Sequence, residues 1–232
     1  MLKTYLKEKH QKQQKKLTNF YTPLGIHVYF KEPIENKQID IEGVIGHLES
    51  MIPTHLLDEI EMIVFGMFDE FKERSLNAMY KDGTLYVSNI QDDHNDLLDD
   101  LIHETSHSLE SRYGFQIYGD GELEKEFLRK REYLHDILWK TGFRTPKSFF
   151  TDLEYNEEFD MFLYKQVGYG KLIDLTSGLF INPYAATSIN EYFATGFTDF
   201  YMDPSHGFLK KLSPVLYRKL ILLQDEKNLD NL

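Results

Sequence analysis

The chain has 232 residues, of which 41% are hydrophobic and 14% aromatic, and it carries a net charge of −12. This apolar content is enough for a packed core, which excludes a wholly disordered protein. The chain contains no Cys, which excludes disulfide scaffolds, thiolate metal sites and cysteine nucleophiles. Because an acidic chain repels the phosphate backbone, we expect no nucleic-acid partner.

The charge is distributed unevenly along the chain. The first 20 residues hold six Lys and one Glu, a net charge of +5, which leaves −17 for the rest. We interpret residues 1–21 as a solvated basic tail, with contact to an acidic surface as the alternative. No secretory signal and no apolar stretch of about 18 residues is visible, so we expect no membrane partner. The default location is cytoplasmic, with export by another route or a place in a virion left open.

The first half of the chain alternates between strand and helix patterns. β-branched and aromatic runs predict strands, a three-to-four spacing of apolar residues predicts helices, and an Asp-Gly pair predicts a hairpin turn. Strands are predicted over 25–30 and 60–65, helices over 41–51 and from an Asn95 N-cap to about 113, and a hairpin over 77–88. Residues 22–113 are therefore predicted to form an α+β subdomain with a mixed sheet.

The second half of the chain has mainly helical patterns. Helices are predicted over 119–139, 157–167, 188–201 and 214–224. The last of these has Pro in its first turn, where the missing N–H costs nothing. We therefore expect a helical subdomain over 114–232.

The sequence His103-Glu104-Thr105-Ser106-His107 is an HExxH pattern within the predicted helix that ends near residue 113. Two His four residues apart lie on one helix face, so both imidazoles can bind one ion. Glu104 could take a proton from water at that ion and pass it to a leaving amine. Zn²⁺ accepts such ligands, so zinc is the expected cofactor. The alternative is two ordinary histidines on a helix.

The strand predicted over 84–88 comes directly before this helix. An edge strand followed by the metal helix is the order of elements in zincins. We therefore expect this strand to pair with an extended peptide, so that the expected partner is a peptide or protein substrate.

The third metal ligand has two candidates. The longer pattern HExxHxxGxxH is absent, because Glu110 and Tyr113 stand where it needs Gly and His. Glu132 begins an ExxxD pattern like that of thermolysin-type enzymes. Glu191 lies further on, although Ser188 three residues before it could make Glu191 only part of a capping box.

The residues around Glu191 resemble those of the anthrax lethal factor-like metallopeptidases, a family that includes the Pro-Pro endopeptidases. The resemblance is carried by HExxH, by Glu191-Tyr192-Phe193-Ala194, by Tyr184 seven residues earlier, and by the later Asp203-Pro204. It implies a zincin fold and a zinc metalloprotease, a hydrolase that cleaves peptide bonds internally. His103, His107 and Glu191 would be the ligands, with Glu104 and Tyr184 catalytic.

This chain also departs from the family pattern. The family often has a second Glu four residues after the ligand, where this chain has Thr195, and Asp199 is a possible substitute. The segment 119–141 would be an insertion relative to the lethal factor. The alternative function is that of a zincin-fold protein that binds a partner or serves a structural role, for example as a component of a virion.

Overall fold

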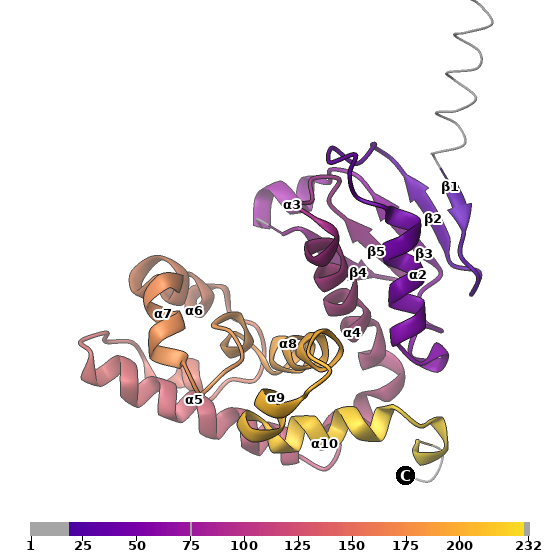
Figure 1. Cartoon of the computed structure of the whole chain (residues 1–232). Coiled ribbons are helices and arrows are strands. Elements are labelled where there is room, and N and C mark those ends of the chain that lie inside the picture. Colours follow the sequence, from indigo (N-terminus) through magenta and orange to yellow (C-terminus); the bar gives the residue numbers. More distant parts are fainter. Residues whose placement is uncertain (1–18, 75, 230–232) are drawn as a thin grey trace, which may run out of the picture. The chain divides into compact units, whose positions relative to one another are not determined.

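The computed structural model describes residues 19–74 and 76–229, which form a series of helices and one five-stranded mixed sheet (Figure 1). The predicted α+β class is therefore confirmed. The chain divides into two compact units, Met1–Leu109 and Glu110–Leu232. The predicted tail lies outside the described residues up to residue 18, and its last three residues, Asn19–Tyr21, form strand β1.

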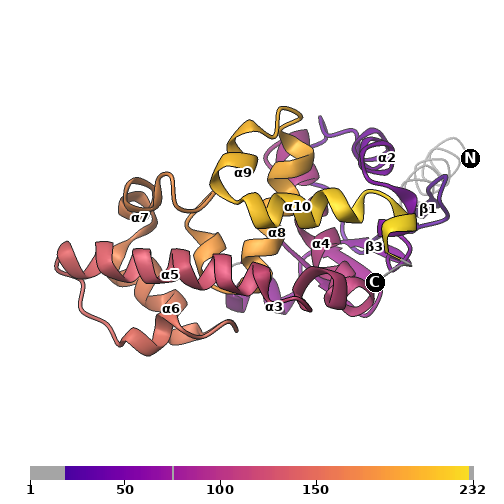
Figure 2. The same cartoon turned by 90° about the horizontal axis from the view of Figure 1, so that it is seen from below.

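The first unit is built on the sheet, whose strand order is β1-β2-β3-β5-β4. β2–β3 and β3–β5 are parallel pairs, whereas β1 and β4 run antiparallel to their neighbours. After β1, the strands are β2 (His27–Phe30), β3 (Met62–Phe65), β4 (Ala78–Lys81) and β5 (Thr84–Val87). Helix α2 (Ile41–Met51) connects β2 to β3 and lies over one face of the sheet (Figures 1 and 2).

The predicted edge strand is wrong. β5, which corresponds to the strand expected over 84–88, pairs with β3 on one side and β4 on the other, so β4 forms the edge. The turn between them holds Asp82 and Gly83 at positive φ angles of 47° and 78°, which gives a tight two-residue hairpin. Both strands of this hairpin are short and partly apolar, so the sequence pattern does not distinguish the inner strand from the outer one.

Helix α4 (His94–Tyr118) carries the HExxH motif, and the division between the two units falls within it. The Oδ1 atom of Asp93 accepts hydrogen bonds from the backbone N–H groups of Asn95 and Asp96 at 2.7 and 3.0 Å. Asp93 therefore caps the helix, rather than Asn95 as predicted. The helix also continues past the predicted end, because Ile117 in its last turn is fully buried.

The second unit is helical. Its longer helices are α5 (Glu122–Lys140), α7 (Tyr169–Thr176), α8 (Ile189–Met202) and α10 (Pro214–Leu223), and its short ones are α6 (Glu157–Met161) and α9 (Gly207–Leu212). α6 continues into a π-helical segment, Phe162–Val167, within the single helix predicted over 157–167. In Figure 2, α6 and α7 flank one half of α5. α7 and α9 were not predicted.

Helix α8 forms the centre of the second unit's core. Most of its residues are buried, as is usual for a helix that is apolar on nearly every face. α8 contacts α5, α9 and α10. Gly196 allows the closest of these approaches, because a Cβ there would overlap the side chain of Leu216 on α10.

The first unit also contains the short helix α3 (Asp69–Arg74). Within residues 19–74 and 76–229, no helix combines the length and the apolar character that crossing a bilayer would require.

Candidate metal centre

His103 and His107 lie one turn apart on α4. Their ring centroids are 5.2 Å apart and the ring planes meet at 70°. Both side chains are half-buried, and the opposite side of the helix is anchored in the core by four apolar residues. These anchoring residues are Leu97, Leu98, Leu101 and Ile102. The helix orientation that presents the two imidazoles is thus set by apolar burial on the other face.

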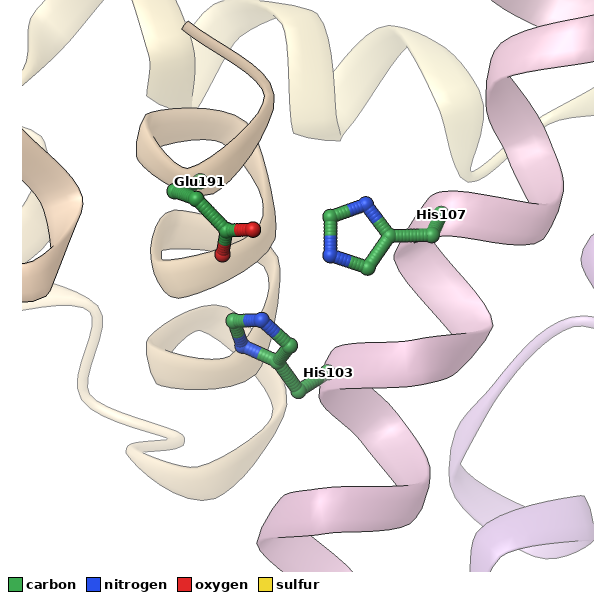
Figure 3. Close-up of side chains that lie close together, drawn as sticks. All are labelled: His103, His107 and Glu191. Carbon is green, nitrogen blue, oxygen red and sulfur yellow. The ribbon is translucent and has the colours of Figure 1, made fainter. Parts of the chain in front are cut away.

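Glu191 stands in the first turn of α8. Ser188 caps this helix, with its Oγ accepting a hydrogen bond from the Glu191 N–H at 3.1 Å. One ligand atom from each of His103, His107 and Glu191 can be chosen so that all three lie within 4.8 Å of one another. Figure 3 shows the Glu191 carboxylate facing the two imidazole rings. Ser188 therefore has the predicted capping role, while the Glu191 carboxylate lies with the two His.

This group of side chains could hold a metal ion. It is the one such group of three or more found in the part of the chain that the structure describes. Ligand atoms around a tetrahedral ion at about 2.1 Å are separated by roughly 3.4 Å, so modest side-chain rotation would bring these three into range. Two imidazoles and a carboxylate are a donor set that suits a divalent transition metal.

The other third-ligand candidate lies elsewhere. The side chain of Glu132 on α5 is exposed, and its Oε1 is 3.7 Å from the Nζ of Lys147. Thr195, where the resembling family often has a second Glu, is buried in α8. Asp199 is half-buried, and burial raises its pKa, with the nearby carboxylate of Asp203 adding to the increase. None of these three belongs to the metal-binding group found among the described residues.

Glu104 lies between the two His but is directed toward the sheet. Its side chain is only 8% exposed. Its Oε2 accepts a hydrogen bond from the backbone N–H of Tyr80 on β4 at 2.7 Å. This contact was not predicted from the sequence, because it joins residues 24 positions apart through the pairing of β4 at the sheet edge.

A second carboxyl group lies one turn before Glu104 on α4. Burial raises the pKa of Asp100 to about 7, and the nearby acids Asp96, Asp99 and Glu104 add to the increase. A hydrogen bond from Gln91 Nε2 at 3.0 Å opposes the increase without cancelling it. The first turns of α4 therefore hold a carboxyl group that is partly protonated near neutral pH.

Tyr184 lies in a short 3-10 helix, Tyr184–Ala186, just before α8. Burial raises the pKa of its phenol well above the usual value, and the Glu191 carboxylate adds to this increase. The phenol therefore keeps its proton at neutral pH and can act as a hydrogen-bond donor.

Arg131 on α5 holds the segment between Tyr184 and Glu191. Its guanidinium is completely buried and donates to the carbonyls of Ala186 at 2.7 Å and Thr187 at 3.3 Å. A third bond goes to the carbonyl of Phe149. We did not identify Arg131 from the sequence, although its place four residues after the apolar Phe127 was a signal that it lies on the buried face of α5.

Asn190 and Glu110 form a further contact that sequence reasoning missed. The Asn190 Nδ2 donates to Glu110 Oε2 at 2.5 Å, so the residue next to Glu191 is hydrogen-bonded to the last part of α4. Both residues belong to the second unit.

The chain was compared with protein-family models, with curated proteins and with solved structures, and none of them matches it. The function is therefore inferred from the residues of the site itself.

Proposed function

We propose that this chain is a zinc-dependent endopeptidase with a zincin-type site. The observation that carries the proposal is the grouping of His103, His107 and Glu191 within 4.8 Å, with Glu104 between the two His in the chain. A metal site used only for structure has no need of a carboxylate in the second position of the motif.

The donor set fits zinc, which binds imidazole and carboxylate and in enzymes keeps one position open. A zinc ion held there would polarise the peptide carbonyl and lower the pKa of water. Glu104 would take the proton of that water and deliver it to the leaving amine. Tyr184, protonated because of its burial, would donate a hydrogen bond to the oxyanion.

Substrate would bind as an extended peptide along β4, the strand at the sheet edge. An exposed edge provides backbone N–H and C=O groups for an added strand. The chain beyond its first 20 residues carries a net charge of −17, so we expect a preference for neutral or basic peptides. A clear preference for acidic peptides in a library would contradict this argument from charge.

Metal analysis together with one variant tests the proposal. Purified protein should contain about one zinc per chain, and Glu104→Ala should keep the metal but lose peptide cleavage, because the base is removed while the ligands remain. Zinc content below about half an equivalent, with no gain when zinc is added, would contradict the proposal. Full zinc content without cleavage of any library peptide would favour a zincin-fold binding or structural protein.

A further inference from the structure

The carboxylate of Glu104 accepts a hydrogen bond from the backbone N–H of Tyr80 on β4. The bond is 2.7 Å long, and the carboxylate that accepts it is almost completely buried. A buried carboxylate is costly without hydrogen bonds, and a bond to a charged acceptor is about twice as strong as a neutral one. This contact therefore contributes strongly to the direction in which Glu104 points.

The N–H of Tyr80 is itself held rigidly. Tyr80 pairs with Leu85 on β5, and in an antiparallel ladder the N–H groups of alternate residues point toward and away from the partner strand. The bond to Glu104 shows that the Tyr80 N–H points away from β5. The hydroxyl of Tyr80 accepts a bond from the Gly83 N–H at 3.2 Å, which ties the side chain to the hairpin turn.

We propose that the backbone N–H of Tyr80 is the positioning group for the general base. By binding Oε2 it sets the direction in which the carboxylate points, and so the place from which the carboxylate takes a proton. This inference rests on the proposed endopeptidase function. It also gives β4 a second task beside pairing with the peptide, since the same strand that would bind the substrate orients the base.

A proline substitution tests this role, because it removes one N–H. Tyr80→Pro deletes a donor that the ladder does not use, and edge strands tolerate Pro at such positions. A misplacement of about 1 Å in a reacting group costs roughly 100-fold in rate, so we expect kcat to fall by about 10- to 100-fold. Zinc content should stay within about twofold of the wild type, because the metal ligands are unchanged, and the loss should appear in kcat even where KM also changes.

The opposite edge of the same sheet supplies a matched control. Tyr21 on β1 also has its N–H directed away from the ladder, because its neighbour Thr22 donates inward to the carbonyl of Ile26 at 2.9 Å. Tyr21→Pro is the same substitution on an edge strand, and it should leave kcat unchanged. Tyr80→Ala loses the hydroxyl contact but keeps the N–H, so it should lose much less activity than Tyr80→Pro.

A second measurement does not depend on activity. In the metal-free protein, Glu104→Gln removes the charged acceptor, so the NMR signal of the Tyr80 amide proton should move upfield. The amide of Leu85, the cross-strand partner of Tyr80, should stay in place and serves as the internal reference. This measurement reports the hydrogen bond even if Tyr80→Pro folds poorly.

Three results would overturn the inference. These are an unchanged Tyr80 amide signal in Glu104→Gln, a wild-type kcat in Tyr80→Pro, or equal losses in Tyr80→Pro and Tyr80→Ala. Wild-type protein that binds zinc and cleaves no peptide would instead contradict the proposed function. If the wild type were inactive and Glu104→Gln still shifted the Tyr80 amide signal upfield, the hydrogen bond would exist but would only stabilise the fold. The Tyr80 N–H would then have no role in catalysis.

Discussion

The two units of the molecule hold their buried charges in different ways. In the first unit two carboxyl groups near the motif accept hydrogen bonds from neighbouring segments, Glu104 from the Tyr80 N–H and Asp100 from Gln91 Nε2. In the second unit two buried cations, Lys130 and Arg131 on α5, donate to backbone carbonyls. The hydrogen bonds in the first unit orient acidic side chains on one continuous helix. Those in the second unit fix the course of the backbone between helices.

The difference determines what each unit can contribute to a metal site. His103 and His107 are placed by one helix, so their spacing follows from helix geometry alone. Tyr184 and Glu191 lie on either side of a bend whose carbonyls are bound by Arg131. We therefore expect the second pair to be sensitive to changes far away in the sequence.

The largest expected effect is the loss of metal when Glu191 is removed. Glu191→Ala deletes one of three proposed ligands. Its zinc affinity should fall by more than about 100-fold, because the loss of a residue that only hydrogen-bonds to a ligand already costs about 10- to 100-fold. Glu132→Ala serves as the matched control and should leave affinity nearly unchanged, because that side chain is exposed beside Lys147. Titration with a zinc chelator measures both.

The reverse result would change the interpretation of the second unit. If Glu132→Ala lost zinc while Glu191→Ala retained it, the thermolysin-like ExxxD pattern would describe the site. Glu191 would then be only an acidic residue in the first turn of α8 and no metal ligand, and the likeness to the lethal factor family would be coincidental.

Tyr184→Phe should give the next largest effect. It removes only the hydroxyl, and loss of one oxyanion donor usually costs about 10²–10³ in kcat. Zinc content and thermal stability should match those of the wild type, because the ring remains in place. A wild-type kcat with any peptide substrate would show that the phenol has no part in the chemistry.

Arg131→Met tests whether a buried cation keeps Glu191 in place. The carbonyls of Ala186 and Thr187 would lose their donor, and unsatisfied buried groups cost about 1–3 kcal/mol each, so we expect a loss of roughly 3 kcal/mol in the free energy of unfolding. Zinc affinity should fall as well, because the bend before α8 is no longer held.

Lys130→Met is the control for this effect. Lys130 is the neighbouring buried cation, and its Nζ donates to the carbonyls of Leu179 and Leu212 at 2.7 and 2.8 Å. Its loss should destabilise the protein to a similar degree without changing zinc affinity. Equal changes in zinc affinity in the two variants would mean that Arg131 acts only on overall stability.

The same contrast explains which features the sequence could predict. The existence of the HExxH helix, of α2 and of α10 follows from apolar spacing, which is a local property, whereas the cap predicted for the HExxH helix was two residues away from the observed one. The sequence does not show which strand of the hairpin pairs with β3, so it does not predict that β4 lies at the edge. The hydrogen bond from Tyr80 to Glu104 depends on that pairing and was therefore missed as well.

Arg131 was missed because a charged residue on a charged amphipathic helix is assigned to solvent unless its position on the apolar face is examined. Glu191 was found through a resemblance of motif, since spacing alone left it equal to Glu132.

The smallest expected effect concerns the carboxyl group of Asp100, and it sharpens the account of the first unit. Burial raises the pKa of Asp100 to about 7, so between pH 4 and 7 the folded protein binds a proton that the unfolded chain releases. Stability should therefore fall as the pH rises through this range, and Asp100→Asn, which can still accept the bond from Gln91, should remove that part of the decline.

We expect the variant to be more stable than the wild type by about 1–3 kcal/mol at pH 8 and by less at pH 5, since each pKa unit corresponds to about 1.4 kcal/mol. Urea unfolding of the metal-free protein at the two pH values measures the difference. Asp93→Asn is the control: hydrogen bonds from the backbone N–H groups of Asp96 and Asn95 lower the pKa of Asp93, so it is ionised in both states at both pH values of the experiment, and the variant should keep the wild-type difference. An unchanged slope in Asp100→Asn would mean that a water or a nearby cation stabilises the ionised carboxylate, and that burial does not keep Asp100 protonated in the folded protein.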